Sequence, residues 1–186
     1  SGRIYWKGHE ISDIDADEAE NYVGYVPQNP KDSLSQETVY AEIALKLRQR
    51  NMDEEAIEKK VDEVAKVCGL QYIKDLPLSM LSFGQLKRVS IAAVLALDPE
   101  LIILDEPAAG QDFSHYKDIM HFLQQIHQNG VTVVIVTHDM HLMLEYTPRA
   151  LVFCNGQLIA DRSAAGVLCD PELIQKAALK ETSLFT

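Results

Sequence analysis

The chain has no long apolar run, no excess of positive charge and no hydrophobic leader, and each absence argues against a class of protein. Its longest apolar stretch, Val89 to Leu97, is interrupted by Ser90 and is far shorter than the roughly 20 residues that cross a bilayer. Lys and Arg total 17 against 28 Asp and Glu, which argues against a nucleic-acid partner bound through its phosphates. The first residues lack the hydrophobic segment of a signal peptide.

Cysteine is also scarce. The three cysteines, Cys68, Cys154 and Cys169, are widely spaced and odd in number. They offer neither a disulfide framework nor a C-x-x-C metal site, which favours a reducing, cytosolic setting. With 186 residues and 47% apolar composition, the chain is long enough to bury the core of one domain. We therefore expect a cytoplasmic globular protein.

The most informative absence is a phosphate-binding loop of the form G-x-x-x-x-G-K-[ST], which occurs nowhere in the sequence. Yet the segment LSFGQLKRVS, residues 81–90, has the features of an anion-binding helix start. Ser82 and Gln85 have the S-x-x-Q spacing of a capping box, with Gly84 between them, and an apolar helical run follows. The unpaired N–H groups and the dipole at such a start favour phosphate. The sequence thus predicts an anion-binding helix start but lacks the phosphate-binding loop that usually accompanies a phosphate site.

Strands and helices alternate along the chain. The segments LIILDE (101–106) and VTVVIV (131–136) are typical of strands buried on both faces of a parallel sheet. NYVGYV predicts a third strand, and hairpins are expected around Lys7-Gly8 and Asn155-Gly156. Helices are expected at about 37–50, 53–68, 82–97, 114–128 and 139–146. This alternation predicts an α/β domain with a mostly parallel sheet.

Three of the predicted strands end in polar side chains: Gln28, the pair Asp105-Glu106, and His138. Ligands of open parallel sheets bind beyond the carboxyl ends of the strands, so we expect a site there. One carboxylate of the pair can face a hydrated Mg²⁺, and the other can act as a base toward an attacking water. A helix N-cap or a solvated turn before Pro107 is the simpler alternative. His138 can hydrogen-bond a phosphate oxygen, or it can merely open the helix that follows.

Taken together, these segments resemble the motifs of ATP-binding-cassette (ABC) proteins. YVPQNP is similar to their Q-loop, LSFGQLKRVSIA to their signature motif, LIILDEP to their Walker B strand, AAGQD to their D-loop and IVTHD to their H-loop. All five occur in the family's order, from about residue 1 to residue 161. The resemblance implies a P-loop NTPase-like (RecA-like) fold whose N-terminal strands and Walker A loop would precede residue 1. We therefore expect the chain to be a piece of a longer protein.

The resemblance also implies an internal organisation. Residues 1–29 and 82–162 would form the RecA-like core, residues 30–81 a helical subdomain that docks on a transporter, and residues 163–186 a C-terminal helical tail. Residues 28–45 and 170–185 are most similar to the ATPase subunits of energy-coupling-factor importers, which bring vitamins or transition-metal ions into prokaryotic cells. A non-catalytic ABC partner subunit and a soluble ABC ATPase of translation or repair are the alternatives.

The resemblance assigns a role to each polar strand end. Gln28 would contact Mg²⁺ and the attacking water. Asp105 would hold Mg²⁺ through water, and Glu106 would be the catalytic base. His138 would stabilise the phosphoryl group that is transferred from ATP.

The signature residues would act on a different ATP molecule. ATPase domains of this family pair head to tail, so Ser82, Gly84 and Gln85 would clamp an ATP held by a second ATPase subunit, and Asp112 of the D-loop would reach across the interface. Phe83 stands where these proteins usually carry glycine. A transmembrane transporter subunit would be the other partner, which would place the protein on the cytoplasmic face of the cell membrane.

A last expectation concerns the sheet. By resemblance, the phosphate-loop strand would lie between the strand that ends at Val136 and the strand that begins near Ala150. Without it, two apolar strands would present unpaired edges, which tend to pair with other chains. We therefore expect these edges to be filled by another chain or segment, to close on each other, or to swap between copies.

Overall fold

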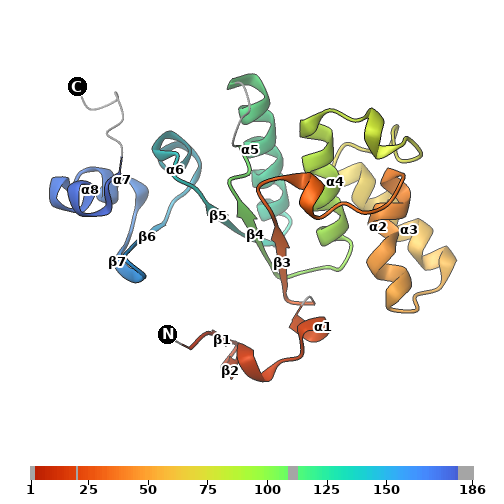
Figure 1. The fold of residues 1–186 in the computed structure, drawn as a ribbon, viewed down its shortest axis with the longest axis horizontal. Coiled ribbons are helices and arrows are strands. Elements are labelled where there is room, and N and C mark those ends of the chain that lie inside the picture. The colour runs from red at the N-terminus through yellow and green to blue at the C-terminus, as the bar shows by residue number, and fades with distance from the viewer. Residues whose placement is uncertain (1–2, 20, 109–112, 180–186) are drawn as a thin grey trace. The chain divides into compact units, whose positions relative to one another are not determined.

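The computed structural model describes residues 3–19, 21–108 and 113–179 (Figure 1). The chain forms two compact units, residues 1–136 and 137–186. The strands of the first unit are β1 (Tyr5–Trp6), β2 (His9–Glu10), β3 (Val23–Val26), β4 (Leu101–Asp105) and β5 (Thr132–Val136). Its helices are α1 (Ala16–Ala19), α2 (Val39–Gln49), α3 (Glu54–Val67), α4 (Phe83–Leu95) and α5 (Phe113–Gln128), with 3₁₀ turns η1 (Ile11–Asp13), η2 (Pro30–Asp32) and η3 (Leu78–Met80). The second unit contains α6 (Met140–Tyr146), β6 (Ala150–Cys154), β7 (Gln157–Arg162), α7 (Ala164–Leu168) and α8 (Pro171–Ala177).

The first unit is organised around a three-stranded parallel sheet in the order β3-β4-β5. Val26 is paired with Leu104, which in turn is paired with Ile135, so the carboxyl ends of all three strands lie at the same edge. The predicted α/β class with a parallel sheet is confirmed. The hairpin predicted at Lys7-Gly8 is also present, as β1 and β2 pair antiparallel.

One face of this sheet is covered by helices and the opposite face is exposed. Ile102 and Leu104 are fully buried, α4 packs on β3, and α5 packs on β5. Gly24 lies so close to α4 that a Cβ atom added to it would come within 2.0 Å of a methyl group of Val94. On the opposite face, in contrast, the side chain of Tyr25 is 56% exposed. We call these the covered face and the open face.

The prediction that β4 and β5 are buried on both faces is wrong for the residues that the structure describes. Burial alternates along β4, and no residue of β5 is fully buried. The cause is the one-sided helical layer, because α4 and α5 protect only every second side chain of the sheet. A continuous apolar run therefore has the exposure pattern of a half-buried strand.

Three helices stand beside the sheet and confirm the helices predicted from periodicity. The Asp53 carboxylate accepts hydrogen bonds from the amides of Glu55 and Ala56 and so caps α3, which ends at Val67 and is followed by Cys68 as C-cap and a left-handed Gly69. Helices α2, α3 and α4 pack against one another. None of the helices in the described ranges is both long and apolar enough to cross a membrane.

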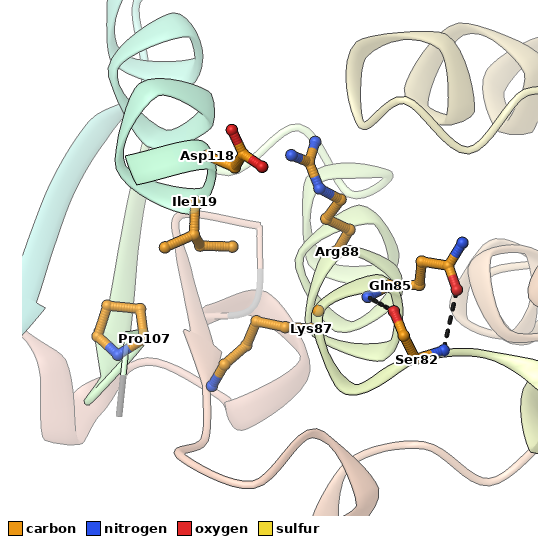
Figure 2. A pocket seen from close by; sticks show the side chains of 8 residues that line it. Ser82, Gln85, Lys87, Arg88, Pro107, Asp118 and Ile119 are labelled. Carbon is orange, nitrogen blue, oxygen red and sulfur yellow. Dashed lines mark hydrogen bonds between the residues drawn. The ribbon is translucent and has the colours of Figure 1, made fainter. Parts of the chain in front are cut away.

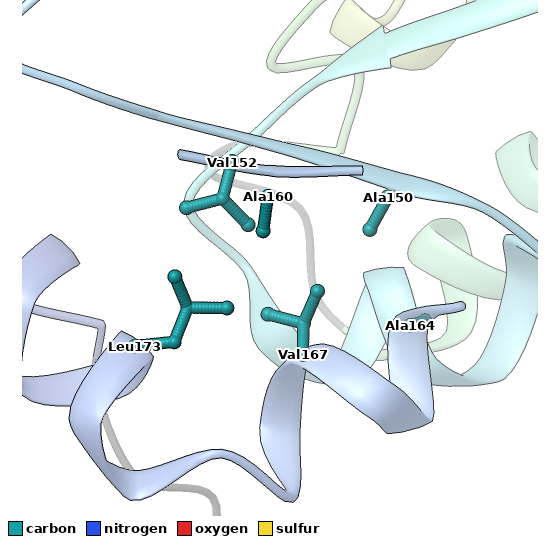
Figure 3. Packing of buried hydrophobic residues seen from close by; sticks show 6 residues of the cluster. All are labelled: Ala150, Val152, Ala160, Ala164, Val167 and Leu173. Carbon is teal, nitrogen blue, oxygen red and sulfur yellow. The ribbon is translucent and has the colours of Figure 1, made fainter. Parts of the chain in front are cut away.

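The second unit is a hairpin packed against two short helices. Asn155 and Gly156 both adopt positive φ angles, 50° and 75°, as the tight turn between β6 and β7 requires. One face of the hairpin packs on α7 and α8 (Figure 3). The buried residues of this core are Ala150, Val152, Ala160, Ala164, Val167 and Leu173.

The strand edges on either side of the expected phosphate-loop strand belong to different sheets. Among the described residues, β5 pairs with β4 and β6 pairs with β7. The expectation that another segment or chain occupies their edges stays a prediction, as do the boundaries expected for the core, the helical subdomain and the tail.

Candidate functional site

The start of α4 is built by the capping box that the sequence predicts. The amide of Gln85 donates to Oγ of Ser82 at 3.3 Å, and the amide of Ser82 donates to Oε1 of Gln85 at 2.9 Å. Ser82 and Gln85 thus stabilise each other and fix where the helix begins. Within the described ranges no group accepts from the amides of Phe83 and Gly84. Two backbone donors therefore remain available at a positive helix end.

This helix start opens on a cavity of about 390 Å³ (Figure 2). A Cβ atom added to Gly84 would meet nothing within 4 Å, so the backbone there is accessible to an approaching group. The side chain of Phe83 is 41% exposed. The cavity is lined by Ser82, Gly84, Gln85, Lys87, Arg88, Pro107, Asp118 and Ile119.

The carboxyl ends of β3 and β4 bring the predicted metal ligands to one edge of the sheet. Asp105 is the last residue of β4, and Gln28 follows β3 with an exposed side chain. The phenol of Tyr25 donates to Oδ2 of Asp105 at 3.1 Å on the open face. Partial desolvation, this hydrogen bond and the charge of Asp105 together raise the pKa of Tyr25. Carboxylate and amide oxygens are ligands that Mg²⁺ accepts, so this donor set fits the ion.

Glu106 has an unusual backbone conformation that the sequence did not indicate. Its φ angle is +42°, in the left-handed region that residues other than glycine rarely adopt and that is common at functional sites. Its amide donates to the carbonyl oxygen of Val136 at 2.9 Å, which ties the turn to the end of β5. The next residue, Pro107, is buried and lines the cavity at the start of α4. Glu106 therefore directly precedes a residue that lines this cavity.

Lys87 is a polar residue of this region that sequence reasoning missed. Its side chain is 1% exposed, and its Nζ donates to the carbonyl oxygens of Pro27 at 2.9 Å and Gln28 at 2.7 Å. Burial lowers the pKa of Lys87, and the nearby charge of Asp105 opposes this effect. A signal was present in the sequence, because Lys87 is four residues before Ile91 and seven before Val94 and so shares their inward helical stripe.

Two further predicted site residues are His138 and Asp112. His138 belongs to the second unit and directly precedes Asp139, whose carboxylate caps α6 by accepting from the amides of His141 and Leu142. The predicted grouping of His138 with Glu106 therefore stays a prediction. Asp112 lies outside the described residues. In the part of the chain that is described, no three His, Cys, Asp or Glu side chains gather as a metal site.

The chain is similar to known proteins over its whole length. The family model of ABC transporters matches residues 1–109. An ABC transporter ATP-binding protein of Enterococcus faecalis is 51% identical over 186 residues, which are 100% of this chain and 33% of that protein. A protein of the same description from Lactobacillus johnsonii is 52% identical over 99% of this chain and 32% of its own length. The chain thus spans about a third of the length of the curated relatives it matches.

Solved structures give the same result. CbiO1 from Clostridium perfringens, part of the ABC transporter complex CbiONQ, matches with a TM-score of 0.83 and 34% identity over 97% of this chain and 73% of that one. An ATP-binding cassette of an ABC transporter in its ADP conformation matches with a TM-score of 0.81 and 26% identity, over 97% of this chain and 78% of that one. The α/β fold with a parallel sheet is the fold of these ATPases. The chain belongs to the ABC transporter family.

Proposed function

We propose that this chain is part of the ATP-hydrolysing subunit of an ABC importer of the energy-coupling-factor type, which powers the uptake of a vitamin or a transition-metal ion. The observation that carries the proposal is the start of α4, where a capping box leaves two backbone donors available beside a cavity. Asp105 and Gln28, at the carboxyl ends of β4 and β3, form a second and separate set of polar groups.

The chain's own residues would supply the hydrolytic half of the site. Asp105 and Gln28 would hold Mg²⁺, which neutralises charge on phosphate oxygens when it is bound. Glu106 would accept the proton of the attacking water, and its left-handed backbone would hold the carboxylate in a fixed direction. His138, which follows β5 in the sequence, would hydrogen-bond the γ-phosphate. The hydrogen bond from Tyr25 would keep the Asp105 carboxylate oriented.

The start of α4 would act on ATP bound to a second ATPase subunit. Its two available amides and its helix dipole suit a phosphate group, and the absence of a side chain at Gly84 allows close approach. Asp112 would lie at the same subunit interface. This arrangement explains why a phosphate-facing helix occurs in a sequence without a phosphate loop.

The proposed partners are this second ATPase subunit, paired head to tail, and a transmembrane transporter subunit. The match to CbiO1, which is part of a transporter complex, supports a membrane partner. The helical region α2–α3 would provide the docking surface, and the protein would act on the cytoplasmic face of the cell membrane. The excess of acidic residues argues against a nucleic-acid partner.

Glu106→Gln in the full-length protein tests this function. Glutamine keeps the shape of the side chain but cannot accept a proton, so we expect ATP turnover to fall by about 10²–10⁴, the usual contribution of a general base. ATP binding should be retained. Turnover is measured by phosphate release from the protein assembled with its transporter partners, and binding by a fluorescent ATP analogue.

Glu172→Gln is the matched control, because Glu172 is exposed on α8 and lies outside both the proposed site and the proposed docking surface. Its turnover should equal that of the wild type. Wild-type turnover in the Glu106 variant would mean that Glu106 is not the base. A wild-type protein that binds ATP without hydrolysing it would support the non-catalytic alternative.

A further inference from the structure

Lys87 is the largest of the fully buried side chains among the described residues, although it carries an ammonium group. Burying a charge is unfavourable unless hydrogen bonds replace its water. In the part of the chain that is described, no carboxylate forms an ion pair with Lys87. Its hydrogen bonds go to two backbone carbonyl groups, those of Pro27 and Gln28. Such a costly arrangement in the signature helix points to a specific task.

The two carbonyl groups belong to consecutive residues, which defines the local shape of the Q-loop. Neighbouring carbonyl groups of an extended strand point in opposite directions. Here both reach a single Nζ atom, so the backbone after β3 must curl around the ammonium. The side chain of Gln28 is left exposed. Figure 2 shows Lys87 leaving α4 on the side of Pro107, away from the contact between Ser82 and Gln85.

The rest of the Q-loop segment, residues 27–36, is held in the same way. Ser33 and Ser90 are joined through their hydroxyl groups at 3.3 Å, so α4 also holds the middle of the segment. The carboxylate of Glu42, which is 4% exposed, accepts from the amides of Ser35 and Gln36, both at 2.7 Å. Buried charges on α4 and α2 thus hold the two ends of the segment.

We propose that Lys87 is a positioning residue that fixes the backbone carrying Gln28 to the signature helix, so that Gln28 and the start of α4 move as one body. In this proposal Lys87 acts through Gln28 and not by direct contact with nucleotide or metal. The proposal rests on the proposed function for its effect on ATP turnover. Its structural content, that Lys87 orders residues 27–36, does not depend on that function.

The first test measures order without nucleotide. Lys87→Met keeps an unbranched side chain of similar length but removes all donors to Pro27 and Gln28. In the full-length protein we expect faster amide hydrogen exchange in residues 27–36, with exchange in α3 unchanged. Lys87→Arg, which restores donors, should return exchange toward the wild-type rate. Lys176→Met, which changes an exposed lysine of α8, is the control. Unchanged exchange in residues 27–36 of Lys87→Met would overturn the proposal.

The second test is a double-mutant cycle on ATP turnover. A misplaced catalytic group lowers rates by up to about 10²-fold, so Lys87→Met should lower kcat about tenfold or more, with a smaller change in KM for ATP. In a Gln28→Ala background the same substitution should have little further effect. If the fold-losses in kcat of the two single variants multiply in the double variant, Lys87 does not act through Gln28.

If Lys87→Met does not fold, Lys87→Gln takes its place in both tests, since its uncharged side chain is one bond shorter than lysine and reaches the two carbonyl groups less well. Faster exchange of residues 27–36 in Lys87→Gln, reversed in Lys87→Arg, supports the proposal, and wild-type exchange in Lys87→Gln would overturn it. A wild-type protein without ATPase activity would overturn the proposed function, whereas the hydrogen-exchange test of Lys87 would stand.

Discussion

The two faces of the central sheet are made by the same three strands but differ in what they carry. The covered face holds Gly24, Ile102 and Leu104 in close contact with helices. The open face holds Tyr25 and Asp105, joined by a hydrogen bond between exposed side chains. Because side chains alternate along a strand, neighbours in sequence belong to opposite faces. Adjacent residues of one strand thus belong either to the buried core or to the candidate site.

The start of α4 and the open face also differ in how far their side chains are protected from water. The start of α4, which we propose acts on a nucleotide held elsewhere, has its capping box and its buried lysine in place. The open face has apolar strand residues such as Val134 and Val136 that are 39% and 51% exposed. Within the described residues nothing protects them from water. Substitutions on the two faces should therefore have very different effects.

The largest expected difference is between Ile102→Ala and Val134→Ala. Ile102 is 0% exposed, and truncating a buried Ile to Ala costs about 2–5 kcal/mol. Val134 is on the open face, where surface substitutions usually change stability by about 0.5 kcal/mol or less. Urea denaturation of the chain of residues 1–186 gives both values. Equal losses would contradict the contrast between the two faces.

A smaller difference is expected between two glycines. Gly24→Ala forces a methyl group against Val94, and such overpacking costs about 1–3 kcal/mol. Gly84→Ala adds its methyl group in open space near the start of α4, where Ala is favoured over Gly by up to about 1 kcal/mol. Thermal unfolding of both variants measures the contrast. A Gly24→Ala protein as stable as the wild type would show that β3 and α4 are less tightly packed than described.

The smallest effect is expected for Tyr25→Phe, which removes the hydrogen bond to Asp105 from the open face. The pKa of Tyr25 is raised above its ordinary value of 10.0, so folding favours the neutral phenol. Its stabilising contribution is therefore fully present below pH 10 and is lost as the pH rises through the raised pKa. We expect a slight stability advantage of the wild type at pH 8 that disappears above pH 10. Thermal unfolding at both pH values tests this, and an advantage that grows with pH would contradict it.

Local sequence signals were sufficient for the helices and strands. The S-x-x-Q spacing predicted the capping box at Ser82 and Gln85, and Asp53 and Gly69 marked the ends of α3, because these interactions lie within a few residues of one another. The apolar runs predicted parallel strands, and the polar groups after them predicted that Gln28 and Asp105 meet at one edge. The roles of Glu106 and His138 came from resemblance and stay predictions.

The contacts that these elements make with one another could not be predicted from local signals. An apolar run cannot reveal that helices cover one face of the sheet, because coverage depends on residues far away in the chain, and so the burial of β4 and β5 was predicted wrongly. The partner of Lys87 was hidden for the same reason, since about 60 residues separate it from Pro27 and Gln28. The elements and their order follow from the sequence, because short-range hydrogen bonds and periodicity are local. The contacts of Lys87 and the face of the sheet that stays open follow from packing, because burial is a property of the whole fold.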